Sequence, residues 1–228
     1  MKVFISVDME GVSGITDPED VLPDGADYQR GRVFMTGDAN AAILGAYDAG
    51  ADEVLVNDSH WVMRNLLLEQ LDSRARTIKG FHKSLCMVQG LDASYDGAVF
   101  VGYHACAGTE GGVLNHTLLG KEIQNVYLNG EPTGETRLNA AYAGHFGVPA
   151  LAVAGREQAT PYRLASPYRL GIEWNSTTIA ATCAMIPGVG LTGSRSVEFV
   201  TDDYPELTRV LVAMLLLAMQ VGQKAIYG

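Results

Sequence analysis

Cysteines and basic residues are scarce in this sequence, and both shortages exclude classes of protein. The three cysteines, Cys86, Cys106 and Cys183, are scattered and form no CxxC pair. An odd, scattered set does not build a disulfide framework or a structural zinc site, so we expect a reducing, cytoplasmic environment. Lys and Arg number 16 against 26 Asp and Glu, which gives a net charge of −10. This balance argues against nucleic acids and anionic membrane surfaces as partners.

Long apolar runs are also missing. The longest, at residues 210–219, is well short of the roughly 20 residues that a membrane-spanning helix needs. It follows Asp202, Asp203 and Glu206, which suit a helix start, so we predict a helix that is buried or faces another subunit. The apolar stretch near the start is too short for a signal sequence and soon meets acidic residues. No GxSxG or SxxK motif supports a serine nucleophile.

The remaining composition is that of a folded protein with alternating helices and strands. The chain has 228 residues, of which 47% are hydrophobic and 18% are charged. Buried strands are predicted at 3–7, 53–57, 98–103 and 148–154, with helices at 28–49, 61–71 and 135–146. This alternation predicts an α/β fold with a mostly parallel sheet and flanking helices.

The pattern changes in the second half of the chain. A hairpin is predicted over 123–134, because Asn129-Gly130 suits a tight type I′ turn. After Gly155 we predict a strand at 170–174, a helix at 177–185, a strand at 196–201 and the terminal helix. We therefore divide the chain into an α/β domain over 1–155 and a smaller C-terminal α+β domain over 156–228, which would serve oligomerisation and form a wall of the pocket.

Three of the predicted strands end in residues that bind metals. VFISVDMEG ends in Asp8 and Glu10, EVLVNDSH ends in Asp58 and His60, and AVFVGYHA ends in His104. In a parallel sheet the carboxyl ends of the strands share one edge, where ligands collect. Asp8 and Glu10 point the same way, roughly 6–7 Å apart along the strand, and repel each other unless a cation lies between them. We therefore predict a metal site in the domain 1–155.

Each candidate residue also has an ordinary structural interpretation. Asp8 at a strand end is suited to capping a helix or forming a turn. His60 would cap or lie on the surface, and His104 would be a hydrogen-bonded core histidine. Glu135, at the head of a predicted helix, complements the helix dipole. His116 is an acid/base catalyst, a third histidine ligand or a loop residue, and the spacing does not choose among these.

Five motifs in order resemble one known family. SVDMEG, VNDSH, GYHA, NHT and the pair Gly134-Glu135 are similar to those of the D-aminopeptidases, the zinc-dependent hydrolases of peptidase family M55. The likeness runs from residue 1 to about 155 and resumes at PYRLGIEW, IPGV and RSVEF. It implies an aminopeptidase that hydrolyses small peptides with an N-terminal D-amino acid. It also implies a homo-oligomer, a self-compartmentalising decameric ring whose active sites face an inner channel.

The resemblance also implies a role for each candidate residue. Two zinc ions would bind each chain, with Asp8 bridging both. Glu10 and His104 would complete the ligands of one ion, and His60 and Glu135 those of the other.

The histidine of the NHT motif, His116, corresponds to the residue proposed to be catalytic in the family. Two other functions remain open at this point. One is a metal-dependent hydrolase of another class, a phosphoesterase or an amidase, because two-metal sites serve several hydrolyses. The other is a metal-binding scaffold without catalysis. No Lys or Arg cluster near the motifs supports phosphate recognition, so we favour the peptidase.

The sequence departs from the family pattern after Gly155. The family usually carries a further, largely helical stretch and an acidic pair there, whereas this chain has Arg156-Glu157 and passes almost directly to PYRL at 161–164. All six site residues precede this point. We expect the departure to affect substrate enclosure and ring assembly rather than the metal site.

Overall fold

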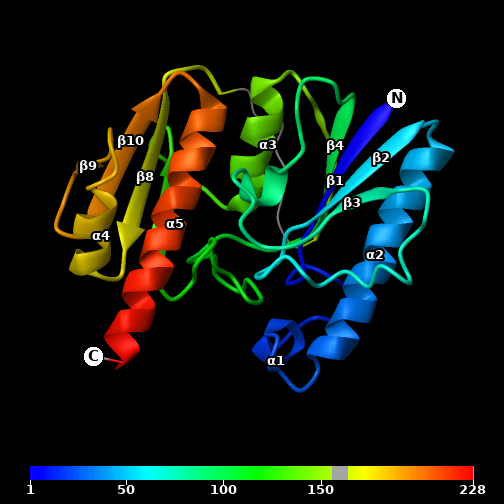
Figure 1. The fold of residues 1–228 in the computed structure, drawn as a ribbon, viewed down its shortest axis with the longest axis horizontal. Coiled ribbons are helices and arrows are strands. Elements are labelled where there is room, and N and C mark those ends of the chain that lie inside the picture. Colours follow the sequence, from blue (N-terminus) through cyan, green and yellow to red (C-terminus); the bar gives the residue numbers. More distant parts are fainter. Residues whose placement is uncertain (156–163, 228) are drawn as a thin grey trace.

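A computed structural model describes residues 1–155 and 164–227, which form two five-stranded sheets side by side (Figure 1). The first sheet is parallel throughout, in the order β3-β2-β1-β4-β7. Its strands are β1 (Lys2–Val7), β2 (Glu53–Asp58), β3 (Arg76–Ile78), β4 (Gly97–Tyr103) and β7 (Ala150–Gly155). The predicted α/β fold with a mostly parallel sheet is thereby confirmed.

The central strands of this sheet are buried on both faces, as expected where helices cover a parallel sheet. Val3 and Ile5 of β1 face helix α2 (Tyr28–Asp48), which contributes the buried Met35 and Ile43 to the same cluster. Phe4, one residue along the strand, belongs to the opposite core. The side chains of β1 therefore alternate between two cores. Residues that follow β1 lie at the carboxyl edge, which it shares with the other parallel strands.

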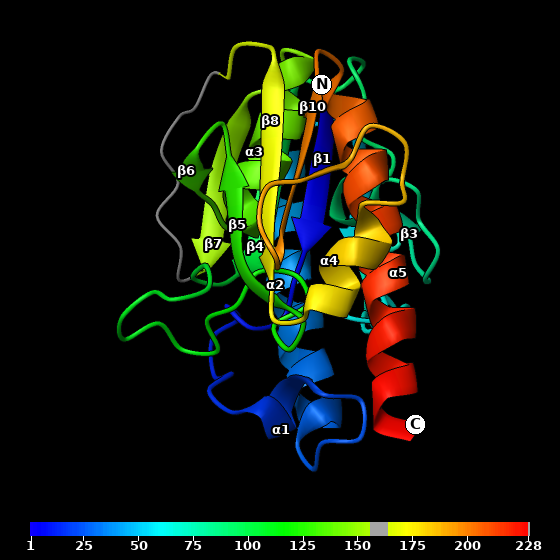
Figure 2. The same cartoon turned by 90° about the vertical axis from the view of Figure 1, so that its left-hand side faces the viewer.

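The second sheet is antiparallel (Figure 2), and the residues on its inner face are mainly apolar. Its strand order is β6-β5-β8-β10-β9. In β8, four alternating residues, Tyr168, Leu170, Ile172 and Trp174, are buried. The strands are β5 (Ile123–Leu128), β6 (Glu131–Pro132), β8 (Tyr168–Trp174), β9 (Gly190–Leu191) and β10 (Ser196–Thr201).

The second sheet is not made up of residues 156–228 alone. β5 pairs with β8, and β6 pairs with β5, so the predicted hairpin is an integral part of this sheet. The predicted domain boundary at residue 155 thus falls between strands that are hydrogen-bonded to one another across it. The stretch at 156–163, where we expected the departure from the family pattern, lies outside the described residues.

Three helices pack between the two sheets, and their apolar side chains form one core with those of both sheets. They are α3 (Glu135–His145), α4 (Thr177–Cys183) and α5 (Tyr204–Tyr227). Among the described residues α5 has one stretch, Tyr204–Gly222, that is long and apolar enough to cross a membrane. Its Leu207, Leu211 and Met214 are buried in the core, so we interpret α5 as a core helix with a partly exposed second face. Two short helices, α1 (Pro18–Val21) and η1 (Cys86–Val88), lie in loops.

The prediction of a helix at 61–71 is wrong, because this stretch consists of turns and bends. Trp61 and Met63 have φ values of 47° and 55°, in the left-handed region that does not continue a right-handed helix. The amide N–H groups of Asn65 and Leu66 donate to the buried carboxylate of Asp58, at 2.6 and 2.8 Å, instead of to helical carbonyls. A tertiary contact therefore overrides the helical pattern of Leu residues.

The chain connections diverge between β1 and β4, and there the two backbones come unusually close. β1 continues to β2 on one side, whereas β4 and β7 lie on the other. The N–H of Gly11 donates to the carbonyl of Gly102 at 2.7 Å. A Cβ at residue 11 would lie 1.9 Å from the carbonyl oxygen of Tyr103, and one at residue 102 would lie 2.2 Å from that of Asp8. Only glycine permits this approach.

Candidate metal centre

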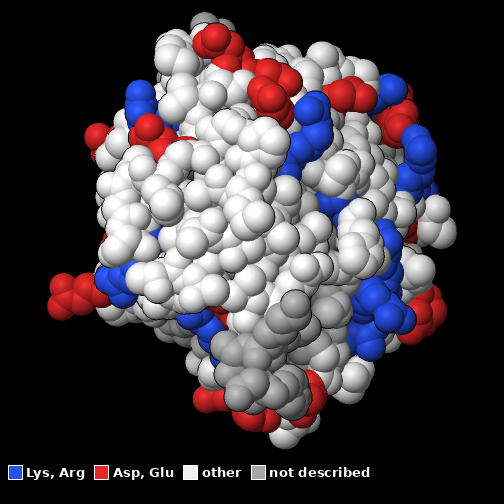
Figure 3. Space-filling view, turned by 60° about the vertical axis from the view of Figure 1, so that its left-hand side comes forward, with Lys and Arg blue, Asp and Glu red and all other residues white. Residues whose placement is uncertain are grey.

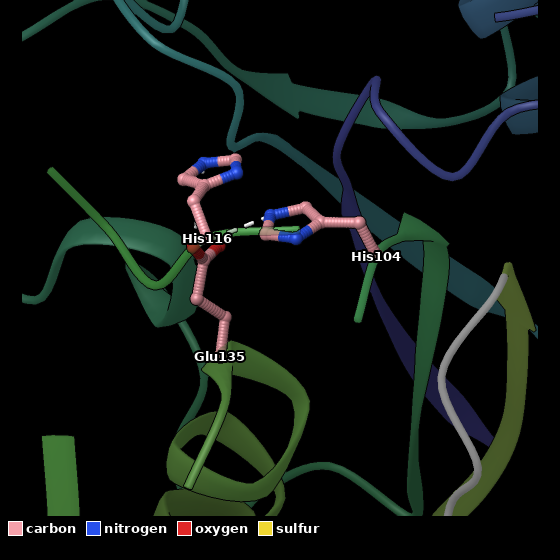
Figure 4. A group of neighbouring side chains, drawn as sticks. All are labelled: His104, His116 and Glu135. Carbon is pink, nitrogen blue, oxygen red and sulfur yellow. Dashed lines mark ion pairs between the residues drawn. The ribbon is translucent and has the colours of Figure 1, made fainter. Parts of the chain in front are cut away.

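The structure brings all six predicted site residues into one cluster at the carboxyl edge of the parallel sheet. Asp8 and Glu10 follow β1, His60 follows β2 and His104 follows β4. The remaining two are Glu135, the first residue of α3, and His116, from the loop between β4 and β5. Figure 4 shows the carboxylate of Glu135 rising from the helix toward the two imidazoles.

On one side of the cluster, His60 contacts both carboxylates of the DxE motif. Its Nδ1 lies 2.9 Å from Oε2 of Glu10 and 3.3 Å from Oδ1 of Asp8. The three side chains are at most 8% exposed. The two acids that share one side of the strand thus converge on a single imidazole nitrogen.

On the other side, His104 contacts the second oxygen of Asp8 and the carboxylate of Glu135. Its Nε2 lies 3.5 Å from Oδ2 of Asp8 and 3.3 Å from Oε1 of Glu135. The N–H of Leu118 donates to the same Glu135 oxygen at 2.7 Å and holds it in place. Asp8 therefore points one oxygen to each half of the cluster.

His116 differs from the other five residues because its side chain is 24% exposed. Its ring stacks on that of His104, with centroids 4.0 Å apart and planes inclined by 10°. Its Nε2 lies 3.8 Å from Glu10 and 3.9 Å from Glu135. His116 thus closes the cluster toward solvent.

A backbone carbonyl orients each of the three histidines. His60 Nε2 bonds to the oxygen of Val21 at 2.9 Å, and His116 Nδ1 bonds to that of Leu114 at 2.8 Å. His104 Nδ1 bonds to the carbonyl oxygen of the next residue at 3.0 Å. A carbonyl only accepts, so each of these nitrogens carries the proton, and in a neutral ring the other nitrogen presents its lone pair to the carboxylates. Metal-binding histidines are typically held in this way.

Burial and mutual charge shift the pKa values of the cluster strongly. Burial and the neighbouring charge of Glu10 raise the pKa of Asp8 to about 8. Burial alone would raise the pKa of Glu10, but the charge of His60 outweighs it and the pKa lies below its usual range. Burial would lower the pKa of His104, but the charge of Glu135 prevails and raises it to about 11. The chain by itself needs bound protons to neutralise this concentration of negative charge.

The residues present fit a metal site. Oδ2 of Asp8 and Nε2 of His104 are buried and have no hydrogen-bond partner within the described residues. Buried polar atoms without partners are rare, and here both point into a cluster of carboxylates and imidazoles. Ligand atoms of Asp8, Glu10 and His104 lie within 4.8 Å of one another, as do those of His104, His116 and Glu135. Imidazole nitrogen and carboxylate oxygen are ligands that zinc takes in proteins.

The resemblance placed Glu10 with His104 on one ion and His60 with Glu135 on the other. The structure contains a group that fits the first set, because ligand atoms of Asp8, Glu10 and His104 lie within 4.8 Å of one another. Ion pairs also join His60 to Glu10 and His104 to Glu135, so contacts cross between the two sets in the metal-free cluster. The division of the ligands between two ions stays a prediction.

Several groups that hold the cluster were not predicted. The carbonyl of Val21 and the amide of Leu118 are backbone groups, which no sequence motif reveals. The side chains of Asn57, Asp58 and Ser59, which precede His60, do not contact its ring nitrogens, which face carboxylates and the carbonyl of Val21. Asp58 instead accepts hydrogen bonds from Asn65 and Leu66 in the turn that follows, and the only signal for this in the sequence was an acidic residue at a strand end.

Comparison with known proteins gives one curated relative and one solved structure. The D-aminopeptidase of Bacillus subtilis (strain 168) is 46% identical over 159 residues, which are 70% of this chain and 57% of the relative. The chain thus spans little more than half the length of that relative. The Zn-dependent D-aminopeptidase DppA from Bacillus subtilis, a self-compartmentalizing protease, has a similar structure with a TM-score of 0.86 and 32% identity. That similarity covers 96% of this chain and 98% of the other.

The family comparison covers more of the chain than the curated relative does. The model of the D-aminopeptidases of peptidase family M55 matches residues 1–160 and 152–213. The two matched segments meet at residues 152–160, which include the place where we expected a departure from the family. Because these segments span nearly the whole sequence, the chain belongs to the D-aminopeptidase family, M55.

Proposed function

We propose that the protein is a zinc-dependent aminopeptidase that releases N-terminal residues, D-amino acids in particular, from small peptides. The observation that carries this proposal is the convergence of buried carboxylates and imidazoles, with two unpartnered atoms, on one strand edge of an M55 chain. The zinc dependence and D-amino acid specificity in the names of the two similar proteins support it.

We further propose that two zinc ions bind each chain. Asp8 would contribute one oxygen to each ion. Glu10 and His104 would hold the first ion, which the grouping of their ligand atoms with those of Asp8 supports, and His60 and Glu135 would hold the second. The bound ions would supply Lewis-acid activation of a water molecule and of the scissile carbonyl.

The chain's own catalytic group in this proposal is His116. It is the most exposed side chain of the cluster, and Leu114 and the ring of His104 fix its orientation. Its Nε2 faces inward, where it can hold a proton for the leaving amine.

Homo-oligomerisation, as a ring of up to ten chains, is part of the proposal. The self-compartmentalizing nature of the similar solved structure supports it. Figure 3 shows a face whose middle is largely free of charged residues. Three large apolar side chains of the second sheet and its connections are exposed: Met185, Leu191 and Val200.

A cytoplasmic location is supported by three free cysteines, of which Cys183 is fully buried.

One assay tests the proposed activity. Purified protein is stripped of metal with a chelator, reloaded with measured zinc, and supplied with the p-nitroanilides of D-alanine and L-alanine. We expect release of p-nitroaniline that appears with zinc, saturates near two equivalents per chain and favours the D-isomer. Zinc binding without hydrolysis of either substrate would favour the scaffold function. Hydrolysis of phosphate esters in preference to both amides would favour the phosphoesterase.

A further inference from the structure

A network of buried hydrogen bonds lies behind the proposed metal centre, and the proposed function does not use it. Its side chains are at most 9% exposed. They come from every element that carries a proposed ligand and from the loop before η1. The members of this buried network are Ser6, Asn57, Ser59, Lys83, Tyr103 and Asn139.

Two members adjoin the ligands that follow β1 and β2. Ser6 lies two residues before Asp8 and therefore on the same side of the strand. Ser59 directly precedes His60. The hydroxyl oxygens of Ser6 and Ser59 are 2.7 Å apart, so the two strand ends are joined immediately behind their ligands.

Two further members adjoin the ligands of β4 and α3. Tyr103 directly precedes His104. Asn139 follows Glu135 by one helical turn and lies on the same face of α3. The amide nitrogen of Asn139 donates to the hydroxyl of Tyr103 at 2.9 Å, which joins the strand to the helix.

The donors at the α3 end determine the direction of this chain of hydrogen bonds. The Nδ2 group of Asn139 only donates, so the hydroxyl of Tyr103 accepts there and donates its own proton to Oγ of Ser6, 2.7 Å away. Ser6 in turn donates to the carbonyl oxygen of Met87 at 2.8 Å. The Tyr103 hydroxyl is thus the group that bonds directly to both Ser6 and Asn139, and a longer connection runs through Met87, whose sulfur lies 3.4 Å from the amide nitrogen of Asn139.

The opposite end is ordered in the same way. The ammonium group of Lys83 only donates, and it bonds to Oδ1 of Asn57 at 2.7 Å. The amide nitrogen of Asn57 therefore faces the carbonyl oxygen of Met87, at 2.7 Å, and Oγ of Ser59, at 3.0 Å. Hydrogen bonds from both ends run inward to Met87, so the network has one consistent arrangement of protons.

We propose that the hydroxyl of Tyr103 is a positioning group for the metal centre. The hydroxyl would hold the ends of β1, β4 and α3 at fixed positions relative to one another. Asp8, His104 and Glu135 would then keep the spacing that a metal ion requires, so this inference rests on the proposed function. Groups that orient metal ligands from behind commonly change metal affinity by 10–100-fold when removed.

The decisive variant is Tyr103→Phe, which removes only the hydroxyl and keeps the ring packed against Phe100. We expect its zinc dissociation constant, measured by competition with a chromophoric chelator, to rise about 10–100-fold. We also expect the visible absorption spectrum of the cobalt-substituted protein to change, because the geometry around the metal changes. The matched control is Tyr204→Phe, which removes another buried hydroxyl, one that donates to the carbonyl of Leu138.

The control separates positioning from general stability. Both variants are expected to melt at a lower temperature, but Tyr204→Phe should keep the zinc affinity and cobalt spectrum of the wild type. Equal zinc affinity and cobalt spectra in Tyr103→Phe and wild type would overturn the inference, as would equal weakening in both variants. If Tyr103→Phe does not fold, Asn139→Leu cuts the same link from the helix side and is judged by the same criteria. A wild-type protein that binds no zinc would instead overturn the proposed function itself, and this inference with it.

Discussion

The carboxyl edge of the parallel sheet and the interior of the antiparallel sheet bury opposite kinds of side chain. At the first lie Asp8, Glu10 and His104, each at most 6% exposed. Asp8 and His104 each have a buried polar atom without a hydrogen-bond partner in the described part of the chain. In the second lie Leu170 and Ile172, which are apolar and at most 1% exposed. Burying like charges destabilises the folded protein, whereas burying apolar surface stabilises it. The apolar cores of both sheets therefore offset the free-energy cost of the charged site at the carboxyl edge.

Backbone strain is distributed in the same way. Among the described residues, seven other than glycine have positive φ, and one of these seven, Asn129, lies in the second sheet, in the β5–β6 turn where this conformation is normal. The other six lie in the loops between β2 and β5 that surround the site: Trp61, Met63, His82, Cys86, Leu114 and Leu118. Such conformations persist where surrounding contacts enforce them, and they cluster at functional sites.

The most damaging change to the charged half should be Asp8→Ala. Asp8 touches both histidines of the cluster, so its loss should release both zinc ions and reduce peptide hydrolysis to background. Glu10→Ala and Glu135→Ala should each weaken one ion more than the other. Metal analysis of the three purified variants after dialysis checks this order. An Asp8→Ala protein that keeps the full zinc content of the wild type would refute the bridging role.

His116→Ala should separate catalysis from metal binding. Loss of a general acid is expected to lower kcat by about 10²–10⁴-fold while zinc content stays at the wild-type level. His145→Ala is the matched control, because His145 is similarly exposed, at 26%, and contacts Tyr168 and Asp203 instead of the cluster. If His116→Ala loses zinc, His116 is a ligand, and the prediction fails.

A large-to-small change in the apolar half should affect stability alone. Leu170→Ala removes a fully buried side chain and should lower the free energy of unfolding by about 2–5 kcal/mol. Zinc affinity at a temperature where the variant is folded should equal that of the wild type. Leu191→Ala, at a residue that is 56% exposed, is the control and should unfold as the wild type does in urea. A loss of zinc affinity in Leu170→Ala would break the division between the two halves.

The smallest of these effects should be a dependence of the melting temperature on pH. The melting temperature of the metal-free protein should fall with pH, whereas the increase that zinc produces should grow. The raised pKa values of Asp8 and His104, about 8 and about 11, mean that the folded metal-free protein binds protons more tightly than the unfolded chain. Their contribution to stability is complete below the unfolded pKa of each group and is lost as pH rises toward the folded values. The melting temperature of chelator-treated protein should therefore fall between pH 6.5 and 8.

Zinc should have the opposite dependence on pH, because its ligands must lose their protons to bind it. The increase in melting temperature that zinc produces should grow over the same interval. Thermal melts with and without zinc at each pH provide the measurement. A melting temperature of the metal-free protein that rises with pH would contradict the charge arrangement described for the cluster.

Much of the site was predictable because it depends on regular strand geometry. The positions of Asp8, Glu10, His60 and His104 follow from three strand ends and from the rule that parallel strands share a carboxyl edge. Glu135 and His116 came from the family motifs rather than from geometry. What escaped prediction depends on tertiary contacts: the turn at 61–71 forms because Asp58 captures its amides. The pairing of β5 with β8 likewise depends on contacts distant in sequence.

The close approach at Gly11 and Gly102 has a consequence for engineering new activities on this scaffold. The interval between the end of β1 and the end of β4 is fixed by main-chain atoms that are already in contact, so it cannot be adjusted through side-chain choice. Libraries that seek another metal or another substrate should leave both glycines unchanged. Diversity is better placed at residues 107–113, ahead of the segment in which Leu114, His116 and Leu118 hold the site.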